Sequence, residues 1–131
     1  MEYKLNIQDV ADMSEEIEEI TFSSHTPADS TARSSNIWTT LTIKGKISFM
    51  QDKVFMRDST KKIAEWSLVR PAEAETYKSV TLEYLHSDTP RKYEMPFAFV
   101  VSYKETFADI DGKFELVLRQ KVDRLDSVTI G

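Results

Sequence analysis

The sequence predicts a mainly β protein, an antiparallel β-barrel or sandwich with one flanking α-helix. Three observations support this prediction. Apolar and polar residues alternate with period two over most of the chain, turn-forming residues separate the alternating segments, and a single segment has helical spacing. Because each alternating segment has one apolar face, the strands must pack those faces against each other or against the helix.

Length and composition limit the possible classes of protein. The 131 residues correspond to one domain, 1–131, and a content of 40% hydrophobic and 30% charged residues is typical of a folded chain. A net charge of -5 argues against specific nucleic-acid binding, which depends on clustered cations. The absence of cysteine excludes disulfides, thiolate metal sites and a cysteine nucleophile.

The N-terminal segments predict two short strands. Tyr3, Leu5 and Ile7 share one face, and Ile20 and Phe22 share another, whereas Ile17 is displaced by one position. A displacement of this kind indicates a β-bulge or a later start of the strand. A polar stretch, FSSHTPADSTARSSN, follows and is unusually long for a connection inside a small sheet.

A long, half-buried strand is expected after the polar stretch. One face of this strand is expected to carry Ile37, Thr39, Leu41 and Ile43, and the other to carry Trp38, Thr40, Thr42 and Lys44. A glycine at position 45 is expected to allow a bend.

The segment RDSTKKIAEWSLVRP predicts the one helix. Ile63 and Trp66 have helical spacing, Leu68 and Val69 are expected to widen the apolar stripe, and Pro71 marks the end. Asp58 or Ser59 is expected to cap the first turn.

Three alternating segments complete the chain. Val80, Leu82 and Tyr84 precede a turn in SDTPRK, and a long strand follows in YEMPFAFVVSYKETF. That strand is expected to align Phe97, Phe99, Val101 and Tyr103 on one side. The Asp111-Gly112 pair predicts a hairpin leading into the strand with Phe114, Leu116 and Leu118.

No constellation for catalysis, cofactor or metal binding emerges. His25 and His86 are far apart without a second ligand at metal-binding spacing, and three glycines form no phosphate-binding loop. The acidic run SEEIEE is better explained as charge that protects an edge strand from aggregation than as a cation site. We therefore expect neither an enzyme nor a bound cofactor.

The order of these segments resembles the tube-protein superfamily. DSTKKIAEWSLV, AETYKSVTLEYL, YEMPFAFVVSYKETF and KFELVLRQKV carry the resemblance, after a polar loop that leads into a long strand. The family comprises phage tail tube proteins and the haemolysin-coregulated protein of type VI secretion. Its members are β-barrels or sandwiches with a flanking helix, and they stack as rings, usually hexameric.

The resemblance implies a ring-forming structural subunit of an injection tube that conducts DNA or effector proteins. Its partners would be other copies of itself in a stacked hexameric ring, together with sheath, baseplate or effector proteins. The polar stretch then becomes an assembly loop that contacts the neighbouring subunit or ring. The residues expected to make contacts in that loop are Ser23, Ser24, His25, Thr26, Pro27, Asp29, Ser30 and Arg33. The residues expected to face the lumen are Thr40, Thr42, Lys44, Thr81 and Glu83.

A second interpretation is a monomeric β-sandwich that binds a peptide or carbohydrate on an aromatic platform of Trp38, Tyr84 or Tyr103. The N-terminus has no apolar run behind a basic start, so synthesis in the cytoplasm without a signal peptide or membrane insertion is expected, before assembly into a particle.

Overall fold

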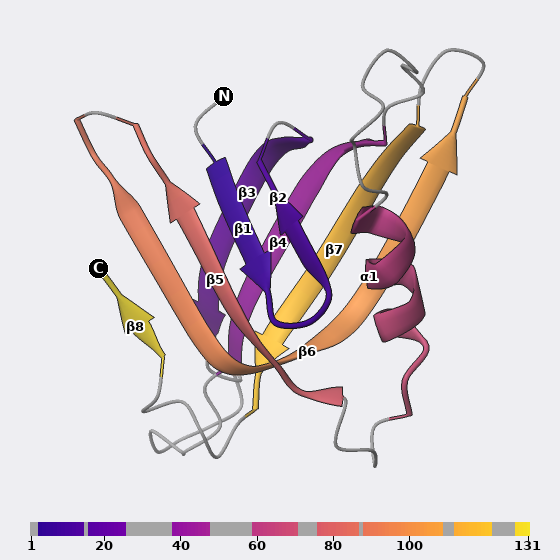
Figure 1. Ribbon diagram of the computed structural model, residues 1–131. Helices are drawn as coiled ribbons and strands as arrows, with labels where there is room; N and C mark the ends of the chain where they lie inside the picture. Colours follow the sequence, from indigo (N-terminus) through magenta and orange to yellow (C-terminus); the bar gives the residue numbers. More distant parts are fainter. Residues whose placement is uncertain are drawn as a thin grey trace.

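The computed structural model describes residues 3–14, 16–25, 38–47, 59–70, 76–86, 88–108, 112–121 and 128–131. Eight strands form one antiparallel sheet in the order β2-β1-β5-β6-β7-β4-β3, and β8 pairs with β6 (Figure 1). The elements are β1 (Tyr3–Ile7), β2 (Ala11–Met13), β3 (Ile17–His25), β4 (Trp38–Ile47), α1 (Ser59–Ser67), β5 (Lys78–Tyr84), β6 (Arg91–Phe107), β7 (Gly112–Gln120) and β8 (Thr129–Ile130).

The predicted mainly β fold with one flanking helix is confirmed. Of the two architectures expected, the open sandwich is the one observed, because β2 and β3 end the sheet without pairing with each other. Within the part of the chain described, no helix is long and apolar enough to cross a membrane.

Strand β6 bends and belongs to both layers of the sandwich (Figure 1). Its first half pairs with β5 on one side and with β8 on the other, and its second half pairs with β7. Strand β6 changes its pairing partner from β5 to β7 at Ala98, which lies opposite both Lys78 of β5 and Gln120 of β7. One layer thus contains β2, β1, β5 and the first half of β6, and the other contains the second half of β6, β7, β4 and β3.

The core lies between these layers and follows the predicted alternation on most strands. Strands β1 to β7 each contribute side chains that are at most 5% exposed, and they include Leu5, Ile7, Leu41, Ile43, Val80, Leu82, Phe114, Leu116 and Leu118. The predicted bulge is present, because the register of β3 against β4 shifts between Ile17 and Glu19.

The simple alternation expected for β6 is wrong. Met95 and Ala98 are fully buried, three positions apart, whereas Val101 is 42% exposed. Register shifts interrupt the pairing with β5 and, between Val100 and Ser102, the pairing with β7. Each extra residue moves the following side chains to the opposite face, so no single face spans the strand.

Helix α1 packs against β2 and β6 and thereby covers one open side of the sandwich (Figure 1). Ile63 and Trp66 are buried as predicted, and the Trp66 Nε1 donates a hydrogen bond to the carbonyl oxygen of Thr76 at 3.0 Å. Leu68 does not widen the apolar stripe, since the helix ends at Ser67 and Leu68 is 82% exposed.

Gly45 lies inside β4, where other parts of the chain pack closely against its backbone. Its φ is not positive, so the backbone conformation does not require a glycine here. A Cβ atom there would collide with the backbone oxygen of Glu16 and lie 2.7 Å from the Phe114 ring. The same Glu16 oxygen accepts a hydrogen bond from the Lys46 amide at 2.7 Å. The glycine therefore admits a crossing backbone and an aromatic ring at the β3 bulge.

Candidate assembly interface

The outward face of the layer formed by β3, β4, β7 and the second half of β6 is mostly hydrophilic, with Val117 of β7 and Trp38 of β4 as apolar side chains on it. On β4, Thr40, Thr42 and Lys44 alternate with the buried Leu41 and Ile43, so the predicted orientation of the strand is observed.

The other two residues expected to face a lumen lie in the opposite layer. Thr81 and Glu83 alternate with the buried Val80 and Leu82 on β5, which pairs with β1 and β6. The core separates the two layers, so these residues and those of β4 lie on different outward faces of the sandwich.

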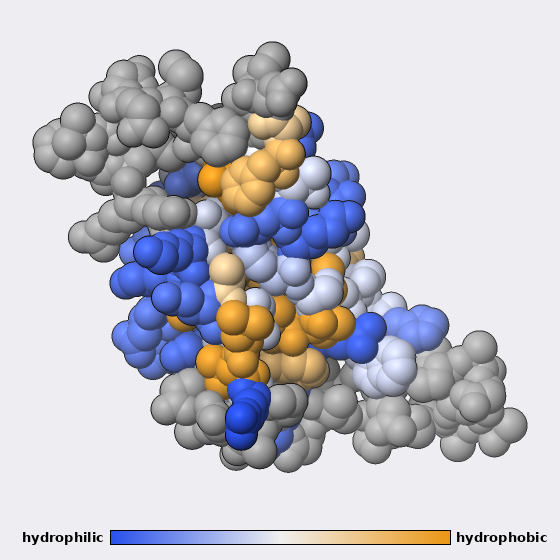
Figure 2. Space-filling model, turned by 90° about the vertical axis from the view of Figure 1, so that its right-hand side faces the viewer, coloured by the Kyte–Doolittle hydropathy of each residue, from blue (hydrophilic) through white to orange (hydrophobic). Residues whose placement is uncertain are grey.

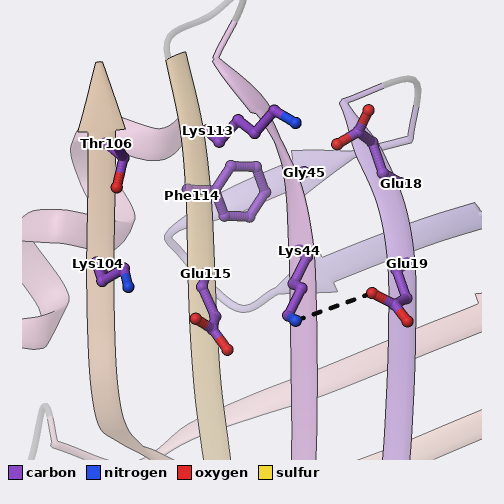
Figure 3. Close-up of a pocket in the computed structure, with 9 residues that line it drawn as sticks. All are labelled: Glu18, Glu19, Lys44, Gly45, Lys104, Thr106, Lys113, Phe114 and Glu115. Carbon is purple, nitrogen blue, oxygen red and sulfur yellow. Dashed lines mark ion pairs between the residues drawn. The ribbon is translucent and has the colours of Figure 1, made fainter. Parts of the chain in front are cut away.

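A row of alternating charges crosses the four-stranded layer. The strand register places Glu19 of β3 opposite Lys44 of β4, Lys44 opposite Glu115 of β7, and Glu115 opposite Lys104 of β6. Figure 3 shows the four side chains at one level across the strands, with the Lys44 Nζ atom 4.0 Å from the Glu19 Oε1 atom. We call these four residues the charge row.

A second polar row lies beside the charge row and is less regular. The Lys46 Nζ atom lies 3.5 Å from a carboxylate oxygen of Glu18, and Lys46 faces Lys113, which faces Thr106. Side chains of both rows line a hollow of ≈ 320 Å³, together with Gly45 and Phe114. The charge row differs from this one because every cation in it is opposite a carboxylate.

Arg119 occupies the other end of the same face. Its Nε atom donates a hydrogen bond to the Thr40 hydroxyl at 3.3 Å, and its guanidinium carbon lies 4.7 Å from the centre of the Trp38 ring. The His25 ring centre lies 6.0 Å from that of Trp38. Trp38 is 38% exposed and is thus covered in part by a cation of its own chain.

The layer ends in two edges, both long. Strand β3 has nine residues and pairs with β4 alone among the described strands. From Phe99 to Phe107, β7 is the one described strand that pairs with β6. Successive neighbours in the layer are antiparallel, so with four strands the two edge strands run in opposite directions.

Apolar side chains accompany the β6 edge. Figure 2 shows them gathered in the lower half of the side that α1 and β6 form. A hollow of ≈ 320 Å³ there is lined by residues of α1 and the turn after it, of β6 and β7, and of the segment before β5, among them Trp66, Val69, Tyr77, Phe99 and Val101. Exposed apolar surface beside a strand edge is typical of a surface that another protein covers.

The structure describes only the first residues of the polar stretch that is predicted to contact neighbouring subunits. Ser23, Ser24 and His25 belong to β3, and they pair with Thr40, Thr39 and Trp38 of β4. Thr26, Pro27, Asp29, Ser30 and Arg33 lie outside the described residues.

No other chemistry emerges among the described residues. They contain no group of three or more histidine, aspartate or glutamate side chains able to hold a metal ion. Trp38, Tyr84 and Tyr103 lie on three different strands. Tyr84 contacts the Tyr3 ring at 5.5 Å, and the Tyr103 hydroxyl donates a hydrogen bond to Glu105 at 2.7 Å, so each aromatic ring belongs to a separate group.

The pattern along the chain does not reveal the charge row. Glu19 belongs to an acidic run, and no local motif marks Glu115 or Lys104. The chain does show a charge within each of four strands, but the positions along the strands that face each other follow from the pairing register.

No protein-family model matches the sequence, and no curated protein matches it. Among solved structures, the chain is similar to one in the cryo-EM structure of the anti-feeding prophage baseplate, symmetrised six-fold. The two are 10% identical, the likeness covers 98% of this chain and 90% of the other, and the TM-score is 0.47. At this TM-score the likeness supports no conclusion about function.

Proposed function

We propose that this protein is a non-enzymatic structural subunit that closes into rings, and that the rings stack into a hollow tube of a phage-tail-like or type VI-like injection apparatus. The tube would conduct DNA or effector proteins. The observation that carries the proposal is a four-stranded layer with a hydrophilic outward face and two long edges of opposite direction.

The two edges of the layer, β3 and the second half of β6, support a ring because both are long and they run in opposite directions. A long edge strand presents unpaired backbone groups and is a template for another chain. When the second half of β6 in one subunit lies beside β3 of the next, the antiparallel order of the layer continues across the joint. The same joint repeated at every subunit is heterologous, and it closes into a ring when the rotation permits.

The outward face supports the role of this layer as the lining of the lumen. Thr40, Thr42 and Lys44 would face the lumen, so that a cargo meets mainly hydroxyls and mixed charges. In the same ring, Thr81 and Glu83 would lie on the outer surface, where sheath or baseplate proteins would contact them.

The polar stretch is proposed to join successive rings. It leaves β3 after His25 and contains Thr26, Pro27, Asp29, Ser30 and Arg33. Polar segments of this length are suited to ordering on a partner.

Size-exclusion chromatography with light scattering, followed by negative-stain microscopy of the same peak, tests the proposal. Six copies of a 15.1 kDa chain would give a mass of about 91 kDa and annular particles. A mass of one subunit over a wide range of concentration, with no annular particles, would contradict the ring. It would favour the monomeric binding module for a peptide or carbohydrate.

A further inference from the structure

We propose that the joint between subunits has one register, in which Lys104 of one subunit lies opposite Glu19 of the next. This inference rests on the proposed ring, and it adds the contact that selects how the two edges align. The partner is a second copy of this chain.

The charge row ends with opposite signs at the two edges of the layer. It begins with Glu19 on β3 and ends with Lys104 on β6, and the residues between them keep the alternation. Placing Lys104 beside Glu19 of the next subunit continues the same pattern without a break. In a closed ring, every cation of the row then lies between two carboxylates, as Lys44 does within each subunit.

Other registers lose this match. A shift by one residue would turn the outward side chains of one edge toward the core of the other, so only shifts by two residues keep both faces. Those shifts place Glu19 opposite Ser102 or Thr106, which are uncharged. The proposed register also pairs two exposed hydroxyl residues, Ser102 and Thr21.

Exposure at both edges permits the contact. Lys104 is exposed, and the Glu19 side chain is 63% exposed despite its ion pair with Lys44. Within one subunit, β7 and β4 separate Lys104 from Glu19, a span of three strand spacings or roughly 14 Å. A contact between these two positions therefore reports on neighbouring subunits.

Disulfide trapping beside the charge row tests the register while both charges remain. The chain has no cysteine, so Ser102→Cys with Thr21→Cys in one chain introduces the only two thiols. Directly opposite residues on antiparallel strands have Cα atoms within the range that a disulfide spans. Diamide oxidises the two thiols to a disulfide and takes up both hydrogens, becoming the hydrazine.

The expected result is a ladder of covalent oligomers on a non-reducing gel, up to the ring size and abolished by dithiothreitol. The pair Ser102→Cys with Ser23→Cys reports a register displaced by two residues, and we expect at least about tenfold less cross-linking from it. Adding Lys104→Glu should weaken the ladder of the first pair, because a carboxylate then faces Glu19. Lys113→Glu is the matched control, with the same charge change on the same face but in the interior strand β7.

Each failure has its own signature. Rings that cross-link best through the displaced pair would overturn the register and leave the ring proposal standing. Rings that cross-link equally well with Lys104→Glu would overturn the selection of that register by the contact between Lys104 and Glu19. Rings in the microscope without cross-linking from either pair would overturn the β6 to β3 joint. A wild-type chain that forms no rings would overturn the proposed function, and with it this inference.

Discussion

At the scale of single residues, Gly45 makes the most specific demand on the fold. The carbonyl oxygen of Glu16 and the ring of Phe114 occupy the space where any side chain at this position would lie. We expect Gly45→Ala to lower the free energy of unfolding by about 1–3 kcal/mol, because either the strand crossing or the ring must move. Urea denaturation followed by circular dichroism measures the change.

Gly131→Ala is the matched control for Gly45→Ala. The nearest heavy atom to a Cβ at position 131 is the Cβ atom of Lys92, at 4.0 Å, which is an ordinary contact. This substitution should change the stability by less than about 0.5 kcal/mol. Equal stability losses in the two variants would contradict the steric explanation.

At the scale of elements, α1 closes one side of the sandwich through a few buried side chains. Ile63 is fully buried in the core cluster, so Ile63→Ala removes apolar contacts and leaves a cavity. We expect a loss of about 2–5 kcal/mol in the free energy of unfolding, measured by urea denaturation.

Leu68→Ala makes the corresponding change just past the end of the helix. Leu68 is 82% exposed, so its truncation should alter the stability of the isolated subunit by less than about 0.5 kcal/mol. A large loss from Leu68→Ala in the monomer would mean that the helix continues to pack beyond Ser67.

The two-residue strand β8 is held at the edge of its layer by hydrogen bonds to β6. The Gly131 amide donates a hydrogen bond to the Lys92 carbonyl oxygen at 2.8 Å, and the Lys92 amide donates one to the Gly131 carbonyl oxygen at 2.9 Å.

The carboxylate of Glu94 accepts a hydrogen bond from the Thr129 hydroxyl at 2.9 Å. This bond, and after it the interaction with Lys92, holds the pKa of Glu94 below its ordinary value. A carboxylate with a lowered pKa stabilises the fold above the unfolded pKa, and that contribution is lost as the pH falls through the folded value.

At the scale of the whole molecule, the charge row ends in opposite charges at its two edges. Two variants with reversed charges at these ends are therefore expected to assemble better when mixed than alone. Lys104→Glu alone should place two carboxylates at each joint, and Glu19→Lys alone should place two ammonium groups there. Each variant alone should therefore form fewer rings than the wild type at low salt. An equal mixture can alternate around an even-numbered ring so that every joint pairs opposite charges, and ring formation should recover, as measured by light scattering.

The mixing experiment needs a check of each variant on its own. The introduced Lys at position 19 also lies beside Lys44, so circular dichroism and thermal unfolding must show that both monomers remain folded. The deficit of each single variant should shrink in high salt, which screens exposed charges. Assembly of either variant alone to the wild-type level, or a mixture that stays monomeric, would contradict the joint.

Most strands and the positions they bury follow from local pattern. Leu5 and Ile7, or Leu41 and Ile43, are buried because alternate residues of a strand point to one face and the apolar face must leave water. Local spacing also predicts the helix, since Ile63 and Trp66 are three residues apart and therefore lie on one helical face. Local pattern failed for the long segment of β6, where two register shifts interrupt the alternation.

By itself, therefore, the sequence determined the class of fold, the orientation of most strands and the polar face that carries Thr40, Thr42 and Lys44, since each depends on residues close together in the chain. Tertiary structure alone decided the bend of β6, the close approach at Gly45 and the charge row. These depend on which residues of distant strands lie opposite each other. That register results from packing the two layers around one core, and alternation within a single strand does not specify it.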